Sequence, residues 1–88
     1  MRIIARNTLI KYWNIHPDTE QPLKSWFDEA QSAFWETSNQ LKRQFRNASI
    51  ITKKRVVFNI KGNNYRLVAD IEYKIGILFV VWIGAHKE

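Results

Sequence analysis

Two short turn signals divide the last third of the chain into three segments that read as adjacent β-strands. In 55–61 and in 65–73, apolar residues recur at every second position, which is the period of a strand with one buried face. A Gly-Asn-Asn sequence at 62–64 separates them, and Gly and Asn tolerate the positive φ that tight hairpins require. A second turn at 74–76 precedes the apolar run 77–83, which is typical of a strand that is central in a sheet or buried on both faces. We therefore expect an antiparallel β-meander.

The N-terminal half has helical spacing instead. Residues 1–5 include an Ile-Ile pair that favours a short strand. A first helix is expected to have Asn7 or Thr8 as its N-cap and to end before His16, because the residue preceding a proline is disfavoured in helical geometry. A clearer second helix has Pro22 in its first turn and an apolar stripe suited to packing on the sheet. The stripe comprises Leu23, Trp26, Phe27, Ala30 and Phe34.

A short third helical segment and a connector lead into the strands. Ser38 is a candidate N-cap for a helical turn over 39–45, and 47–54 reads as a connector. The length of 88 residues is enough for one hydrophobic core, so we expect a single domain spanning residues 1–88. The predicted fold class is α+β in the order β-α-α-β-β-β, with two N-terminal helices packed on the antiparallel meander.

Composition excludes several classes of protein. The absence of cysteine rules out disulfides and thiolate metal sites and suits a cytoplasmic protein. We expect neither a signal peptide nor a membrane anchor, because the N-terminal segment lacks a long apolar run and 75–85 is too short to span a bilayer. The only histidines are His16 and His86, and no metal-binding spacing, phosphate-binding glycine loop or Ser-His-Asp pattern is evident. We therefore expect no metal and no cofactor.

The charge of the chain is asymmetric. The net charge is +6, yet residues 1–40 contain four Lys/Arg against five Asp/Glu, whereas residues 41–88 contain ten against three. A one-sided basic surface attracts polyanions, and counterion release strengthens the attraction when the polyanion is nucleic acid. Simple solubility is the other explanation of the same charge. The basic residues that we expect to contact RNA through this attraction are Arg43, Arg46, Lys53, Lys54 and Arg55.

Metal-free cleavage of RNA is the chemistry that the remaining polar residues allow. Attack by the 2′-hydroxyl needs a base for its proton, an acid for the leaving 5′-oxygen and cations for the charge developing on phosphorus. Arg66, on the polar side of the middle strand, suits the cationic role. His86 suits proton transfer, because imidazole ordinarily changes its charge near neutral pH. Lys61 and Asn63, near the first hairpin, are placed to hold phosphate or orient a base.

These residues also have purely structural explanations. Arg66 would then be a surface strand residue paired with Asp70 or Glu72, and His86 would be an exposed terminal residue. His16 precedes a proline in an expected loop, and we interpret it as an ordinary surface residue.

Several blocks of the C-terminal half match one known pattern. They are Arg-Asn-Ala-Ser-Ile at 46–50, Arg-Val-Val-Phe-Asn-Ile at 55–60, Gly-Asn at 62–63, Tyr-Arg-Leu-Val at 65–68, Ile-Glu-Tyr at 71–73 and Gly-Ala-His-Lys-Glu at 84–88. Together they resemble the HigB family of bacterial toxins, the mRNA interferases of type II toxin–antitoxin modules, with Ala85 in place of the usual Thr. The resemblance implies a RelE-like fold and ribosome-associated, metal-independent endoribonuclease cleavage of translated mRNA. It also implies neutralisation by a HigA antitoxin, a helix-turn-helix protein, with oligomers formed mainly through that complex.

The resemblance also assigns roles to residues. The matching family positions are Asn63, Arg66, His86 and Glu88, with Lys61 as a neighbour, and the expected catalytic set is Arg66, His86 and Glu88. Family members continue with Tyr-Asp after the glutamate, whereas this sequence stops at Glu88, so we expect weakened cleavage if that Tyr and Asp act at the scissile phosphate or hold His86 in place. A non-catalytic RNA-binding or protein-binding module with the toxin fold is the alternative. A small DNA-binding regulator is a more distant one, because no basic recognition helix is evident.

Overall fold

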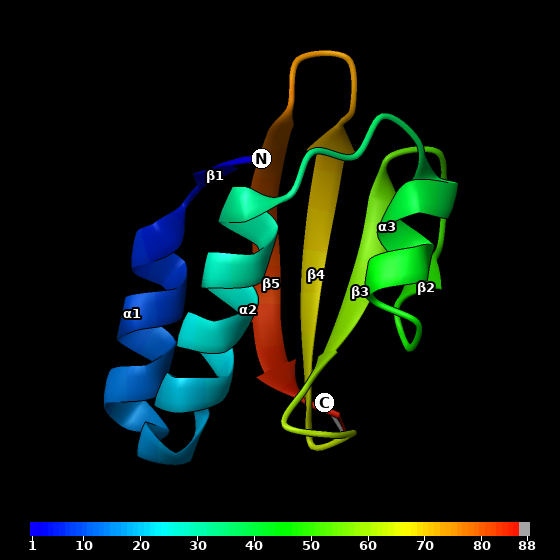
Figure 1. The fold of residues 1–88 in the computed structure, drawn as a ribbon. Coiled ribbons are helices and arrows are strands. Elements are labelled where there is room, and N and C mark those ends of the chain that lie inside the picture. The colour runs from blue at the N-terminus through cyan, green and yellow to red at the C-terminus, as the bar shows by residue number, and fades with distance from the viewer. Residues whose placement is uncertain (87–88) are drawn as a thin grey trace.

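The chain folds into a layer of helices packed on one face of a five-stranded sheet (Figure 1). The structure is a computed structural model that describes residues 1–86. In chain order the elements are β1 (Arg2–Ile4), α1 (Arg6–Ile15), the 3-10 turn η1 (Pro17–Thr19), α2 (Glu20–Ser32), α3 (Ser38–Gln44), β2 (Ser49–Ile50), β3 (Arg55–Ile60), β4 (Tyr65–Glu72) and β5 (Ile77–Ala85). The predicted α+β class is confirmed.

The sheet has the strand order β1-β5-β4-β3-β2. Its β3, β4 and β5 form the predicted antiparallel meander. Two further strands extend the meander at its edges. β1 pairs in parallel with β5, so the sheet is mixed rather than purely antiparallel. β2 lies inside the 47–54 segment predicted as a connector, and it pairs with β3. β2 is only two residues long, too short to show an alternation of its own, and the partner of β1 lies at the other end of the chain.

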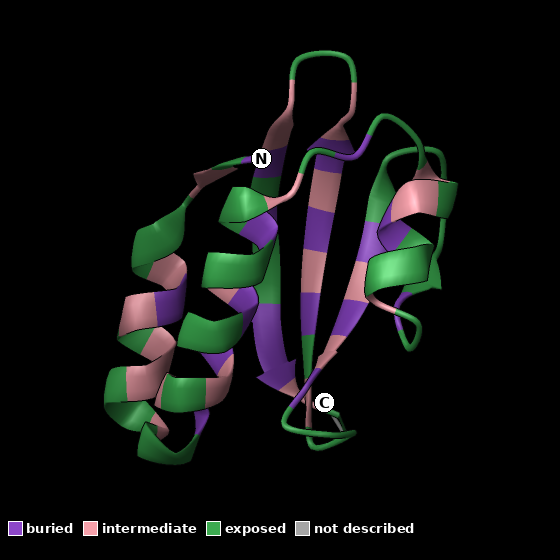
Figure 2. Ribbon diagram, in the orientation of Figure 1, coloured by how far each residue is buried: buried purple, intermediate pink, exposed green. Residues whose placement is uncertain are grey.

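The buried residues gather between the sheet and the helices (Figure 2). The strands contribute Val56, Phe58, Ile60, Leu67, Ala69, Ile71, Leu78, Val80 and Ile83, which are the alternating apolar positions of the meander and of β5. Leu9 of α1, together with Leu23, Trp26 and Ala30 of α2, packs against them. Because the helices lie on this side of the sheet, the other side, here called the open face, is left uncovered within residues 1–86 (Figure 1).

The apolar run of β5 is only half explained by burial. The strand is central, as predicted, because β1 and β4 pair with its two edges. Burial on both faces, however, is wrong: Phe79, Val81 and Trp82 are exposed by 39%, 46% and 38%. These three side chains belong to the open face, where the described part of the chain provides nothing to cover them.

Two helix ends differ from the sequence-based expectation. α2 stops at Ser32, so Phe34 lies beyond the helix and is 75% exposed instead of continuing the apolar stripe. The short third helix is present, but its N-cap is Thr37 rather than Ser38. The Thr37 Oγ1 accepts a hydrogen bond from the backbone N–H of Gln40 at 3.3 Å, which satisfies one otherwise unpaired donor of the first turn.

α1 also begins earlier than predicted. Its N-cap is Ala5, in the left-handed region at φ 71°, without a side-chain hydrogen bond, so neither Asn7 nor Thr8 acts as the cap. The helix ends at Ile15, as the following His-Pro sequence predicts. None of the helices within residues 1–86 has the length and hydrophobicity needed to cross a membrane.

Phe58 on β3 joins the helices to the sheet through an aromatic cluster. Its ring centroid lies 5.3 Å from that of Trp26 on α2 and 5.1 Å from that of Phe45 after α3, both in edge-to-face geometry. The Trp35 ring lies at 6.5 Å and is nearly parallel to it. Since such pairs each contribute about 0.5–1.5 kcal/mol beyond burial itself, the cluster is a major part of the core of so small a domain.

We predict that Phe58→Ala will lower the free energy of unfolding by about 3–5 kcal/mol, because it leaves a cavity among three aromatic rings. A small domain has only about 5–15 kcal/mol in total, so a large loss in the urea midpoint should be measurable. Phe34→Ala is the matched control, because that ring is 75% exposed, and it should change stability by less than about 0.5 kcal/mol. Equal effects of the two substitutions would contradict the role of the cluster.

Candidate active site

An open cleft lies on the open face, where the β3–β4 hairpin meets the end of β5. Its lining residues come from four parts of the chain and are Ser49, Ile51, Val57, Asn59, Asn63, Arg66 and His86. Three of the residues that the sequence nominates for RNA chemistry, Asn63, Arg66 and His86, are therefore brought together. The apolar side chains of Ile51 and Val57 contribute to a lining that otherwise consists of polar groups.

Sheet register places Arg66 between β3 and β5 in the lining of this cleft. Arg66 pairs with Asn59 on β3 and with Gly84 on β5. Because Gly84 has no side chain, the Arg66 guanidinium meets no bulky neighbour on β5. It can therefore reach the imidazole of His86. The Arg66 Nη2 group donates a hydrogen bond to His86 Nε2.

This contact sets the direction of the hydrogen bond. An arginine is a donor only, so His86 Nε2 is the acceptor. The backbone of His86 is also held, because its N–H donates to the carbonyl of Asn64 in the hairpin at 3.0 Å. One cation and one group able to accept a proton are thus fixed side by side on an exposed surface.

Arg66 is an exposed residue of β4, as its structural explanation expected, but the pairing with Asp70 or Glu72 in that explanation is wrong. Asp70 pairs instead with Arg55, which donates from Nε to Oδ1 at 2.9 Å and from Nη2 to Oδ2 at 3.0 Å. Glu72 pairs with Lys54 at 2.5 Å. Both strand carboxylates therefore have other partners, and the bidentate Arg55 bond lowers the pKa of Asp70 below its ordinary value.

The hairpin beside the cleft has a tight and unusual backbone. Lys61 and Gly62 have φ values of 53° and 65°, so the positive φ expected for a Gly-Asn turn falls on Lys61 and Gly62. The turn directs the Lys61 side chain towards η1, where its Nζ donates to Asp18 Oδ2 at 3.0 Å. Lys61 consequently does not line the cleft, although its neighbour Asn63 does.

Asp18 connects the hairpin to the helical layer. Its Oδ2 also accepts a hydrogen bond from the hydroxyl of Tyr65, the first residue of β4, at 2.8 Å. The bonds from Tyr65 and then Lys61 lower the pKa of the Asp18 carboxyl, and the same carboxylate raises the pKa of the Tyr65 hydroxyl. The two donors lie 43 and 47 residues from Asp18 in the sequence, so no local sequence pattern predicts the contact.

The other predicted RNA-binding residues lie outside the cleft. Lys54 and Arg55 are at the opposite end of β3 and pair with Glu72 and Asp70, while Lys53 is exposed in the preceding turn.

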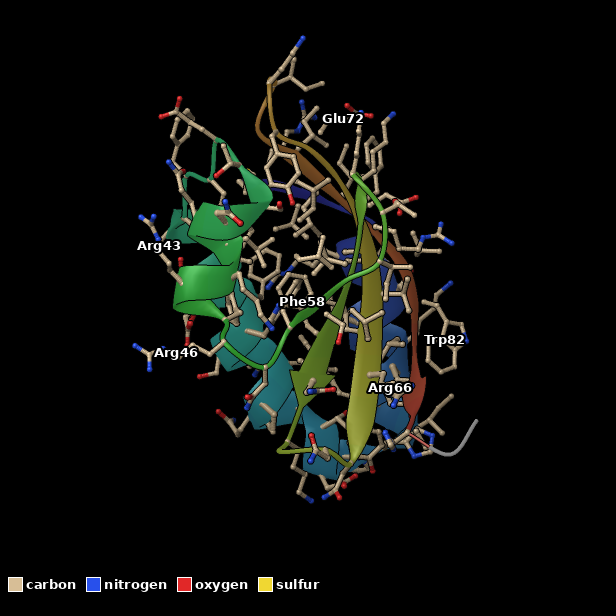
Figure 3. All side chains as sticks on the ribbon, turned by 90° about the vertical axis from the view of Figure 1, so that its right-hand side faces the viewer. Arg43, Arg46, Phe58, Arg66, Glu72 and Trp82 are labelled. Atoms are coloured by element: carbon tan, nitrogen blue, oxygen red, sulfur yellow. The ribbon has the colours of Figure 1, made fainter. Side chains whose placement is uncertain are left out.

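Arg43 and Arg46 form a separate basic surface. Together with Asn39 and Lys42 they line a shallow hollow along α3. In Figure 3 they lie on the opposite side of the molecule from Arg66. The predicted catalytic Glu88 lies outside the described residues.

Sequence reasoning missed two polar residues of the cleft. Asn59 is opposite Arg66, and its Nδ2 donates to the carbonyl of Asn47 at 3.0 Å. The sequence could have indicated Asn59, because this amide lies on the solvent-facing side of the alternating strand 55–61, where core packing does not require it. Ser49 gave no comparable signal, because it enters the cleft through β2, a strand that the sequence does not reveal.

Comparison with known proteins gives one result that covers most of the chain. The family model of the HigB toxin, described as the RelE-like toxic component of a toxin–antitoxin system, matches residues 19–88. The matched segment includes every residue that lines the cleft. No curated protein matched the sequence.

The Asp18 contact makes a pH-dependent prediction. Because the fold lowers the pKa of this carboxyl below 3.8, the stability that it contributes is present above that value and is lost as the pH falls through the lowered pKa. Asp18→Asn should therefore lower the urea midpoint most at neutral pH, and its difference from the wild type should shrink as the pH falls below 3.8. Tyr65→Phe should add little in the Asp18→Asn background. A difference that stays constant with pH would rule out the contact as its origin.

Proposed function

This chain belongs to the HigB toxin family, the RelE-like toxic components of toxin–antitoxin systems, and we propose that it acts as an endoribonuclease on translated mRNA. The observation that carries the proposal is the contact between Arg66 and His86 in an open cleft of a basic protein. Membership of the family supports a ribonuclease type of activity in general, and the cleft supplies residues with the required chemistry.

The proposed reaction is a transesterification within the RNA. The 2′-oxygen attacks the adjacent phosphorus, loses its proton to a base and forms a 2′,3′-cyclic phosphate. The bond from phosphorus to the 5′-oxygen breaks, and solvent water gives the leaving oxygen its proton. The nucleophile belongs to the RNA itself, so the protein needs only to move protons and stabilise the charge that develops on phosphorus.

Arg66 is the cation in this proposal. Its side chain is exposed on the open face, and a guanidinium can hold two phosphate oxygens at once. A phosphate is a stronger acceptor for the guanidinium than a neutral imidazole is, so substrate binding releases the lone pair of His86 Nε2. That nitrogen then accepts the 2′-hydroxyl proton, while Asn63 and Asn59 provide amides to orient the nucleotide.

A translating ribosome is the proposed setting. The cleft is open, so it accepts single-stranded RNA without a deep pocket for one base, and the ribosome would present the mRNA in extended form. Arg43, Arg46 and Lys53 are exposed cations that would contact phosphates outside the cleft. Lys54 and Arg55 would contribute less, because carboxylates already hold them. The protein would therefore act in the cytoplasm.

An antitoxin partner follows from the family, whose members are the toxic components of two-part systems. We propose that this partner is a HigA-type helix-turn-helix protein and that larger assemblies form through the complex.

The catalytic proposal predicts a specific loss of cleavage. Arg66→Ala should slow mRNA cleavage in a translating extract by about 10²–10³-fold, because it removes the charge that stabilises the transition state. Arg66→Lys should recover only part of the rate, since lysine lacks the planar fork. His86→Ala should cost about 10²–10⁴-fold through lost proton transfer.

Arg2→Ala is the control for this series, because Arg2 is an exposed arginine on β1 outside the cleft. It should cleave at the wild-type rate. If Arg66→Ala retained activity within threefold of the Arg2→Ala rate, the cleft would not be the active site. A wild-type chain that folds and binds RNA but never cuts it would instead be a binding module.

A second prediction concerns the basic surface of α3. Replacing Arg43 and Arg46 together by Gln should make the salt dependence of RNA binding shallower by about 0.7 per lost phosphate contact in a plot of log K against log salt. A non-cleavable 2′-O-methyl RNA serves as the ligand. The double substitution Lys11→Gln with Lys24→Gln removes the same charge from the acidic half and should leave the slope unchanged. Identical slopes for the two double variants would exclude α3 from RNA binding.

A further inference from the structure

An exposed apolar strip runs along β5 next to the cleft. It consists of Phe79, Val81 and Trp82, all on the open face of the sheet. Neither the stability of the core nor the proposed proton-transfer chemistry uses these side chains. A large exposed tryptophan in a domain of 88 residues therefore has no structural explanation of its own.

A break in the sheet register turns Trp82 outwards. Val68 of β4 pairs with Trp82, but the next residue, Ala69, pairs with Val80, so Val81 is an extra residue on β5. Leu78 and Val80 point into the core, and a strict alternation would send residue 82 there too. The bulge shifts the phase, and Ile83 takes the core position instead. The bulge therefore places the Trp82 side chain on the open face.

The displayed ring lies beside the candidate active site. Arg66 pairs with Gly84 and Val68 pairs with Trp82, so Arg66 and Trp82 are diagonal neighbours on the same face of adjacent strands. Side chains in this relation are close enough for long and aromatic groups to meet a common ligand. In Figure 3 both side chains lie on the same side of the sheet.

We propose that Trp82 is a stacking platform for a nucleobase of single-stranded RNA next to the phosphate held by Arg66. Phe79, opposite Asp70 and roughly 10 Å further along β5, would stack a second base, so the RNA would follow β5 away from the cleft. The inference rests on the proposed function, because it places the cleaved phosphate at Arg66 and His86. It adds a base-binding subsite that sets how the RNA lies across the sheet.

The area of the strip favours RNA over a protein partner. Its three side chains together expose on the order of 250 Å², given about 150–250 Å² for a whole aromatic side chain. A stable protein interface needs about 800 Å² from each partner, whereas stacking of one or two bases needs much less.

The charges around the strip agree with this choice. Asp70 and Glu72 on β4 are each paired with a cation, which reduces their repulsion of a phosphate backbone. Arg66 has no carboxylate partner among the described residues, so its charge is available to a polyanion. An aromatic surface next to a free cation is the combination used to bind single-stranded nucleic acid.

The test is the affinity of the full chain for a non-cleavable 2′-O-methyl RNA oligonucleotide. Trp82→Ala should weaken binding by about 5- to 100-fold, the effect of losing one stacked base, and Trp82→Phe should fall between it and the wild type. The salt dependence should stay the same in Trp82→Ala, because stacking releases no counterions. Quenching of tryptophan fluorescence by the RNA should largely disappear in Trp82→Phe.

Phe34→Ala is the matched control, since it removes a 75% exposed aromatic ring from the segment that follows α2, on the helical side of the sheet, and it should bind RNA as the wild type does. If Trp82→Ala bound RNA with wild-type affinity, the inference would be overturned. The result would be clearest if the same variant failed to bind the antitoxin, because the strip would then serve a protein partner. If Arg66→Ala cleaved normally while Trp82→Ala lost affinity, the proposed active site would fail and the stacking subsite would stand.

Discussion

β4 pairs along its length with β3 on one edge and with β5 on the other, and both the core and the site require this double pairing. It fixes which side chains face the helices and which face the solvent. Leu67, Ala69 and Ile71 enter the core, whereas Arg66 and Val68 belong to the open face. A slip of one residue would exchange the two sets and expose the core, so hydrophobic burial enforces the register that positions the site.

The site is assembled where several elements end, and separate contacts hold each end. His86 follows β5, and its backbone N–H donates a hydrogen bond to Asn64. The hydroxyl of Tyr65, at the start of β4, donates to Asp18 in the η1 turn between α1 and α2. The stable core therefore lies on one face of the sheet and the polar cleft on the other. This separation lets the open face keep features that do not add to the stability of the core, such as the exposed Trp82 and the Arg66 side chain, which has no carboxylate partner among residues 1–86.

The sequence predicted features that depend on local pattern and residue type. The alternation of 55–73 predicted β3, β4 and their hairpin, and the donor and imidazole chemistry of Arg66 and His86 nominated two residues that do meet. Contacts between distant segments could not be predicted. Local sequence does not indicate the Asp18–Tyr65 bond, the parallel pairing of β1 or the two-residue β2. It does not indicate the bulge at Val81 either, although this bulge changes the direction of the Trp82 side chain. The roles of these residues in RNA cleavage remain predictions.

We propose that the chain cuts RNA by using the 2′-hydroxyl of its substrate, held at Arg66 and His86. The most direct measurement compares two mRNAs in a translating extract, one unmodified and one with a single 2′-deoxynucleotide at the cleaved position. We expect the unmodified mRNA to yield fragments that end in a 2′,3′-cyclic phosphate, and we expect the modified position to stay intact. Equal cleavage of both mRNAs, or no cleavage of either by the folded protein, would contradict it.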